Sequence, residues 1–326
     1  MYERIAANIR KSWFLIIGFV LFVCLIGLVA GYLTGYGYWP VGIAVIIAIA
    51  MMWGSYFASV KIALSVSRAQ PADPSHYQQL HNIVEGLALA GGMPKPRVYV
   101  VNDDAPNAFA TGRNPEHAAI AVTTGLLAKM KRDELEGVLA HELAHVKNRD
   151  TLVMTLAVTL VGTIVLLADI LIRVMWFGGG RNNDRGGGLG LPFAIIGIAL
   201  LVISPIIAQA MQFAISRQRE FLADAEAINL TRYPPGLINA LDKLRGDRTV
   251  VRSASRATAH LWIESPTQLE AHKGQRGASK SGTWLNRLFE THPPLEQRIA
   301  ALQSIAGMPP TEQPMEPTAP GSPPVG

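Results

Sequence analysis

The sequence predicts a mainly α protein with a small β-sheet (α+β), a transmembrane hairpin at the N-terminus and a second apolar hairpin farther along the chain. The 326 residues are 49% hydrophobic and only 16% charged, whereas soluble domains carry about 25% charged residues. No Asp, Glu, Lys or Arg lies between Lys11 and Lys61. From Gln70 to about Arg149 polar and apolar residues interleave, as they do in a domain that folds in water.

The uncharged stretch is long enough for two membrane-spanning helices of roughly 20 residues each, which we place at about 12–34 and 41–60. Between them, residues 35–40 read Gly-Tyr-Gly-Tyr-Trp-Pro; Gly and Pro interrupt helices, and the aromatic rings suit a membrane interface. A cleaved signal peptide is the alternative, but its apolar core would be shorter and no second apolar run would follow. Basic residues flank both spans and predict that both flanks are cytoplasmic: Arg4, Arg10, Lys11, Lys61 and Arg68.

Charge and cysteine content narrow the possible partners. The net charge of +5 and the pI near 9.4 fit a protein at an anionic membrane surface. The basic residues form no nucleic-acid motif, so nucleic acid is not an expected partner. Cys24 is the only cysteine and lies inside the first span, which rules out a disulfide within the chain and is compatible with a reducing cytoplasmic side.

The interleaved region predicts a helix, two strands and a second helix. Apolar residues at helical spacing predict a helix that starts at Asp73 or Ser75 and ends at Gly91 and Gly92. Strands are expected at 97–101 and 117–123, separated by a turn-rich segment at 102–115. They could form a small sheet.

The second of these helices carries the chemistry. Asp133 is expected to be its N-cap, with Glu136 completing a capping box, and the helix is expected to cover 135–146. On it, His141 and His145 are four residues apart, which puts two imidazoles on one face, able to bind one metal ion. Glu142 is not needed as a ligand, and it can take a proton from the attacking water.

The alternative is a pair of surface histidines on an amphipathic helix. The neighbouring positions are apolar, which indicates a buried helix whose histidines need partners: Val138, Leu139, Leu143 and Val146.

A catalytic zinc needs three protein ligands and one open position. The third ligand cannot come from the extended H-E-x-x-H-x-x-G-x-x-H motif, because Asn148 and Thr151 replace its Gly and His. A carboxylate from a second helix is the other common solution, and we choose Glu220 in the segment 219–226. Asp224 lies one turn later, where it could accept the second N–H of a ligating histidine and fix its tautomer. Taken alone, these two acidic residues would be typical of a solvent-exposed helix face, which is the alternative.

Four motifs in order give the chain a resemblance to HtpX-type membrane metalloproteases and, more distantly, to the CAAX prenyl endopeptidases. They are Asn107–Gly112, His141–His145, Glu220–Asp224 and Thr291–Pro294 followed by Arg298. The resemblance implies a zincin-like domain with one Zn²⁺ per subunit, bound by His141, His145 and Glu220, with Glu142 as general base.

The resemblance also implies that His292 and Arg298 assist at the scissile carbonyl, and we place Asn107 with them as a substrate or transition-state contact. A His or Arg donor beside the metal would stabilise the oxyanion. The alternative is that residues 291–294 are an N-cap and first turn, with Arg298 exposed on the helix that follows. The strand at 118–123 is either an edge that receives substrate as an added strand, which the resemblance favours, or a structural strand.

Two more apolar runs, at 151–172 and 191–215, are joined by a Gly-rich loop at 178–190. Each is long enough to span a membrane; a buried helical hairpin under the catalytic domain is the alternative. The predicted organisation is therefore a transmembrane hairpin at 1–68, two parts of the protease domain at 69–150 and 216–307, the second hairpin at 151–215, and a disordered Pro-rich tail at 308–326. A basic, irregular loop is expected at 245–281.

The function predicted is a zinc-dependent endopeptidase in a bacterial cytoplasmic (inner) membrane. It is expected to face the cytoplasm and to cut membrane or misfolded proteins; the quality-control role follows from the resemblance alone. Two alternatives stay open. A prenyl-peptide processing enzyme would share the chemistry, and a membrane scaffold with a structural metal site would explain the helices but not Glu142.

Overall fold

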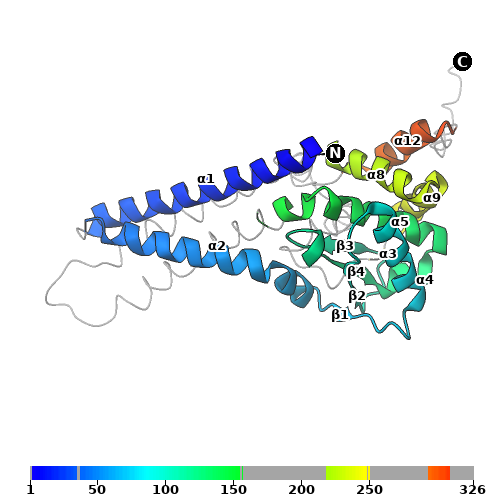
Figure 1. Cartoon of the computed structure of the whole chain (residues 1–326), viewed down its shortest axis with the longest axis horizontal. Helices are drawn as coiled ribbons and strands as arrows, with labels where there is room; N and C mark the ends of the chain where they lie inside the picture. The colour runs from blue at the N-terminus through cyan, green and yellow to red at the C-terminus, as the bar shows by residue number, and fades with distance from the viewer. Residues whose placement is uncertain are drawn as a thin grey trace, which may run out of the picture.

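Two long helices at the N-terminus, α1 (Tyr2–Thr34) and α2 (Trp39–Val66), lie side by side as a hairpin that projects from the rest of the protein (Figure 1). The computed structural model describes residues 2–34, 37–154, 156, 218–247, 249 and 293–308. Both helices are long and apolar enough to cross a membrane, over Ile5–Val29 and Val41–Ala58. The predicted pair of apolar helices is confirmed. The proposed span limits and domain boundaries stay predictions, and most of 151–215, the loop at 245–281 and the tail fall outside the described residues.

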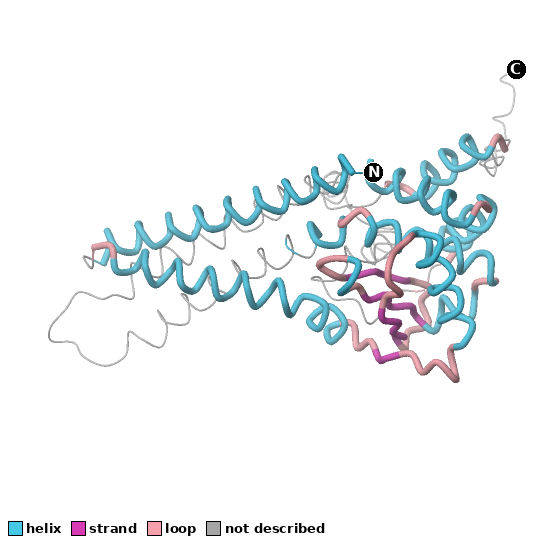
Figure 2. The backbone as a smooth tube through the Cα atoms, in the orientation of Figure 1, coloured by secondary structure: helices cyan, strands magenta, loops and turns pink. Residues whose placement is uncertain are grey.

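A four-stranded mixed sheet follows the hairpin, in the order β1-β2-β4-β3 (Figure 2). Its strands are β1 (Gln70–Pro71), β2 (Arg97–Val101), β3 (Ala108–Thr111) and β4 (Ala119–Thr123). β4 pairs in parallel with β2 and antiparallel with β3, and β1 pairs antiparallel with β2.

The structure corrects three sequence predictions. The strand expected at 118–123 is not an edge, because β4 has a partner on each side, and its role is therefore structural. The two edge strands are β1 and β3. β3 lies inside the segment predicted to be rich in turns; its four residues are all buried, so they show no polar alternation that would predict a strand. His117 belongs to a short 3₁₀ helix, η1 (Pro115–His117), and not to β4.

Helices cover both faces of the sheet. On one face, α3 (Gln78–Gly91) and α5 (Arg132–Lys147) pack against Val98, Ile120 and Val122. On the other face, the C-terminal end of α2 packs against Phe109, Ala119 and Ala121. The short α4 (Thr124–Lys129) follows β4, and α8 (Gln218–Thr231), α9 (Pro234–Gly246) and α12 (Leu295–Ala306) pack beyond α5. Because it lies between the sheet and these three helices, α5 is enclosed.

The two predicted helices of this region begin elsewhere than expected. α5 begins at Arg132, and its capping carboxylate is Glu134, which accepts a 2.7 Å hydrogen bond from the backbone N–H of Lys131. The buried Glu134 also pairs with Lys243 of α9, so tertiary contacts select this cap over the one proposed at Asp133. α3 begins at Gln78, because Asp73 closes a separate turn by accepting from the N–H and hydroxyl of Ser75.

Close contact between α5 and α9 depends on glycine. A Cβ atom at Gly137 would lie 2.6 Å from the backbone nitrogen of Leu237. The absence of a side chain therefore lets α9 pack directly against the helix that carries the histidines.

Candidate active site

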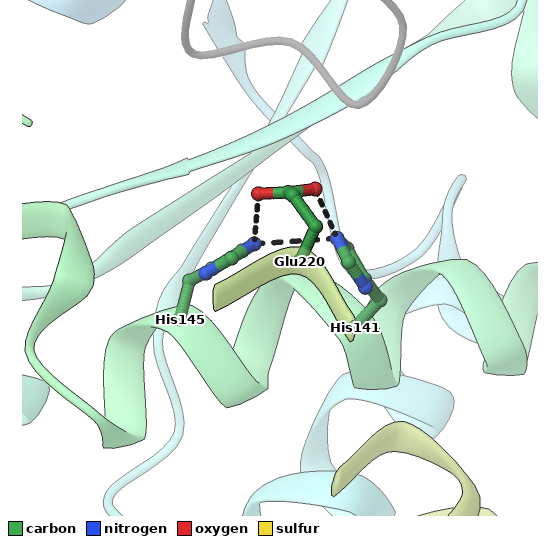
Figure 3. Close-up of side chains that lie close together, drawn as sticks. All are labelled: His141, His145 and Glu220. Atoms are coloured by element: carbon green, nitrogen blue, oxygen red, sulfur yellow. Dashed lines mark hydrogen bonds and ion pairs between the residues drawn. The ribbon is translucent and has the colours of Figure 1, made fainter. Parts of the chain in front are cut away.

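Helix α5 presents His141 and His145 side by side on one face. Both are buried, and their Nε2 atoms lie 3.2 Å apart. Glu220, in the first turn of α8, brings its carboxylate over this pair: Oε2 lies 3.6 Å from Nε2 of His141, and Oε1 lies 3.5 Å from Nε2 of His145 (Figure 3). The structure thus brings together the three residues proposed as ligands, from two helices far apart in the sequence.

The three donors fit a metal ion. Two ligand atoms about 2.1 Å from one Zn²⁺ at a tetrahedral angle lie roughly 3.4 Å apart, and the donor separations here are 3.2, 3.5 and 3.6 Å. Potential ligand atoms of all three residues lie within 4.8 Å of one another, and all three residues are buried. Three protein donors leave one coordination position open, as catalytic sites do and structural sites do not.

A carboxylate holds the far nitrogen of each histidine. Nδ1 of His141 lies 2.9 Å from Oδ1 of Asp224, and Nδ1 of His145 lies 3.2 Å from Oδ2 of Asp150. Each contact favours the tautomer with the proton on Nδ1, which leaves the Nε2 lone pair directed at the centre. Asp224 lies where the sequence placed it. Asp150 was missed; its only sequence signal is its position, five residues after His145.

Arg298 of α12 is completely buried, which excludes the alternative of an exposed position on this helix; its role at the scissile carbonyl stays a prediction. Its Nε and Nη2 donate to the two carboxylate oxygens of Asp224, at 2.9 and 2.6 Å, and Nη2 lies 3.3 Å from the His141 ring nitrogens. The guanidinium is held behind the ligand it supports. Its Nη1 has no hydrogen-bond partner among the described residues and lies 3.7 Å from Oε2 of Glu220.

Glu142 lies beside the two histidines without taking part in the donor set. Its side chain is buried, and Oε2 accepts a 2.9 Å hydrogen bond from the backbone N–H of Ala110 in the edge strand β3. Burial raises the pKa of this carboxyl and nearby Glu220 raises it further, while His141, His145 and the Ala110 N–H lower it, with a net rise. A carboxyl with a raised pKa, fixed beside a metal site, has the character of a general base.

The surrounding charges favour a cation at this centre. Burial and Arg298 lower the pKa of His141, but the carboxylates of Asp224 and Glu220 outweigh them and raise it to about 9. His145 behaves alike: burial lowers its pKa, and Asp150 and Glu220 produce a net rise. With no metal ion these imidazoles attract protons, and a bound divalent cation would replace them.

Asn107 and His292 are the two remaining candidates from the sequence. Asn107 is buried just before β3, where Oδ1 accepts from the N–H of Ala108 and the backbone N–H donates to Oγ1 of Thr123. These contacts fix the start of the edge strand. His292 lies outside the described residues, so its proposed role stays a prediction.

Comparison with known proteins agrees with the site. The family model described as peptidase family M48 matches residues 74–306. The chain is 43% identical over 307 residues to a Protease HtpX homolog of Caldanaerobacter subterraneus subsp. tengcongensis, covering 94% of this chain and 98% of that relative. A Protease HtpX homolog of Streptococcus gordonii is 42% identical over 311 residues, covering 94% of this chain and 100% of the relative.

Among solved structures, S. mikatae Ste24p aligns with a TM-score of 0.49 at 19% identity, over 93% of this chain and 67% of the other. The family match and the relatives over nearly the full length confirm the resemblance to HtpX-type proteases. The chain belongs to peptidase family M48.

Proposed function

We propose that this membrane metalloprotease is a zinc-dependent endopeptidase of a bacterial cytoplasmic membrane, which cuts misfolded or membrane proteins on the cytoplasmic side. One observation carries the proposal. The three buried residues that could bind a metal lie beside the carboxylate of Glu142, which is not one of them and accepts a hydrogen bond from a backbone N–H. A structural metal site has no use for such a carboxylate. A hydrolase needs one as its base.

The residues of the site divide the work of peptide hydrolysis. His141, His145 and Glu220 would hold the metal, and when bound Zn²⁺ would polarise the scissile carbonyl and make its water more acidic. Glu142 takes the proton of the attacking water and delivers it to the leaving amine, the two transfers that a carboxyl with a raised pKa performs well. Nη1 of Arg298 has no hydrogen-bond partner among the described residues and lies 3.7 Å from Oε2 of Glu220, which makes it, with His292, the candidate donor to the oxyanion.

The edge strand β3 supports a proposal for how a polypeptide binds. Ala110 of β3 is bonded to Glu142, so this strand runs directly beside the proposed base. The side of β3 opposite β4 has no strand partner among the described residues, and an extended peptide that paired there would place its backbone next to Glu142. Recognition of the main chain would suit a protease that acts on unfolded segments of varied sequence.

The N-terminal hairpin supports the membrane location and the cytoplasmic orientation. Basic residues flank the two apolar helices on the side of the catalytic unit, and the turn between them is uncharged. A single cysteine at the exposed Glu116, in a Cys24→Ser background, tests the orientation. An impermeant maleimide should label it in cells only after the cytoplasmic membrane is permeabilised; labelling in intact cells would place the site outside.

Reconstitution in lipid vesicles tests the proposed activity. Wild type and Glu142→Gln, both loaded with zinc, would be given a misfolded membrane protein and, separately, a prenylated peptide. We expect the wild type to cleave the misfolded protein and the variant to cleave neither substrate. Cleavage restricted to the prenylated peptide would support the prenyl-processing alternative, and an inert but zinc-loaded wild type would support the scaffold.

A further inference from the structure

Asp150 contacts a proposed metal ligand from outside the ligand set. Its Oδ2 lies 3.2 Å from Nδ1 of His145, while Nε2 of the same ring faces His141 and Glu220. Asp150 is 3% exposed, so this contact is screened from water. The imidazole is therefore fixed between a carboxylate and the centre. Such a contact sets the tautomer and raises the basicity of the ligand nitrogen.

Two side chains from other helices hold Asp150 by its second oxygen. Oδ1 accepts a 2.7 Å hydrogen bond from Nδ2 of Asn8, and Nη1 of Arg219 lies 3.3 Å away. Nδ2 of Asn8 also donates to the backbone carbonyl of Asn148 at 2.9 Å. Both hydrogens of this amide are thus used on the turn that follows α5.

The turn itself needs this support. Arg149 has a φ of +58°, a left-handed conformation that costs free energy for a residue with a side chain. It lies in the two-residue turn between α5 and a helical segment that begins at Asp150, and the side chain of Asp150 reaches back to His145. The amide of Asn8 fastens this turn on both sides of Arg149.

Asn8 belongs to α1, the first apolar helix. It is buried, as is Ser12 one turn later, although the helix is otherwise apolar enough to span a membrane. The N-terminal end of α1 lies beside the start of α8 (Figure 1). A buried amide costs free energy unless it is hydrogen-bonded. The partners of the Asn8 amide are Asp150, which contacts the proposed ligand His145, and the backbone carbonyl of Asn148 in the same turn.

We propose that Asp150 is a positioning residue for His145 and that Asn8 couples α1 to the metal site through it. The inference rests on the metal site of the proposed function. It adds that the site reaches its full metal affinity only when α1 packs against the turn at 148–150, so that metal loading depends on the N-terminal hairpin. A simpler role for Asn8, satisfying one carbonyl at the end of a helix, would leave metal binding unchanged.

Metal affinity, and not proteolysis, is the measurement that tests this. Full-length protein in detergent would be titrated with Zn²⁺ against a chelator of known affinity, and the absorption spectrum of the Co²⁺ form would report the geometry of the ligands. The variants are Asp150→Asn, which keeps the shape, and Asn8→Leu, which keeps the branching at Cγ but removes the amide. Ser12→Ala is the matched control, because the Ser12 hydroxyl is buried on the same face and donates to the Asn8 carbonyl rather than to the turn.

Asp150→Asn should weaken Zn²⁺ binding by about 10- to 100-fold, as the loss of such supporting groups does, and should change the Co²⁺ spectrum. Asn8→Leu removes two hydrogen bonds, of which the one to Asp150 acts on the metal site, and it should weaken Zn²⁺ binding by about fivefold, the factor to which the loss of that one bond corresponds. In the Asp150→Asn background, Asn8→Leu should add nothing, because two residues that act through one contact are not additive. Ser12→Ala should match the wild type.

Unchanged Zn²⁺ affinity and Co²⁺ spectrum in folded Asp150→Asn would overturn the positioning role, and the proposed protease function would stand. Full additivity of the two changes would overturn the coupling through Asp150. If Asp150→Asn does not fold, Asn8→Leu against Ser12→Ala decides the question, since equal affinity in these two would reject the coupling. His145→Ala, which lacks a proposed ligand, is the control for lost metal binding. A wild type that binds no more metal than this variant would overturn this inference together with the proposed function.

Discussion

The backbone N–H of Ala110 donates to Oε2 of Glu142 over 2.9 Å, so an edge strand of the sheet holds the proposed general base by its main chain. This contact joins two parts of the site with different local patterns: a helix that carries the two histidines at helical spacing and a four-residue strand without polar alternation. It also lowers the pKa of a carboxyl that burial, above all, raises. The orientation and the acidity of Glu142 therefore depend on the same hydrogen bond.

Ala110→Pro removes this N–H from an edge strand, a place where proline is tolerated. The carboxylate loses a donor, so the pKa of Glu142 should rise further, and the acidic limb of the pH profile of kcat/KM should move to higher pH. Ala110→Gly keeps the N–H and is the control. An unmoved acidic limb in a folded, metal-loaded Ala110→Pro would show that this contact does not set the acidity of the base.

The buried pair of Arg298 and Asp224 should be essential for stability. Removal of one partner from a buried ion pair costs about 3–5 kcal/mol, because the remaining charge is left without compensation. Arg298→Met should therefore lower the free energy of unfolding by about that amount, and Asp224→Asn should restore part of it in the double variant. The exposed pair of Arg245 and Asp242 is the control; Arg245→Met should change stability by less than about 1 kcal/mol. Chemical denaturation of the wild type and of these three variants measures the free energies of unfolding.

Gly137→Ala should destabilise the protein although alanine favours helix. The added Cβ would lie 2.6 Å from the backbone of Leu237, and overpacking of this kind costs about 1–3 kcal/mol. A Cβ atom at Gly86 of α3 would meet no described atom within 4 Å, so Gly86→Ala should stabilise the helix by up to about 1 kcal/mol. If both substitutions stabilise the protein in thermal unfolding, the close approach of α5 and α9 is wrong.

Metal binding should strengthen as pH rises. The proton competes with the metal for His141, whose pKa is raised from 6.5 to about 9 in the metal-free protein. Zn²⁺ affinity should therefore increase as pH rises towards about 9 and level off above that value. The stability of the metal-free protein should change in the opposite direction, because the contribution of protonated His141 is complete below 6.5 and is lost as pH rises through about 9. Calorimetric titrations with Zn²⁺ at several pH values measure this affinity. An affinity that did not change with pH would contradict the account.

The candidate residues that lie at helical spacing could be predicted from the sequence. His141, Glu142 and His145 follow from one motif, and Glu220 follows from the need for a third ligand on another helix. The fold class followed in the same way, since long apolar helices and a short interleaved region leave strong local patterns. The β2 strand was also found, because a run of β-branched and aromatic residues marks it.

The parts that escaped depend on contacts between distant residues. The sequence predicts turns where β3 lies, because four buried residues between two loops have no periodicity. The cap of α5 was misplaced because Lys243, far along the chain, draws Glu134 into that position. Asp150 and Asn8 are 142 residues apart, and only the fold shows that they meet. An exposed Arg298 stays open as an alternative in the sequence, because its partner Asp224 lies on α8, far along the chain.

The comparison of wild type with Glu142→Gln is the most direct test of the central claim. Zinc content would be measured for both purified proteins, together with cleavage of an unfolded protein substrate. The account predicts that the variant keeps one zinc per chain, because Glu142 is not a ligand, while kcat/KM falls by about 100-fold or more, as the loss of a general base requires. Equal cleavage by both proteins with zinc bound, or no cleavage by a fully loaded wild type, would contradict it.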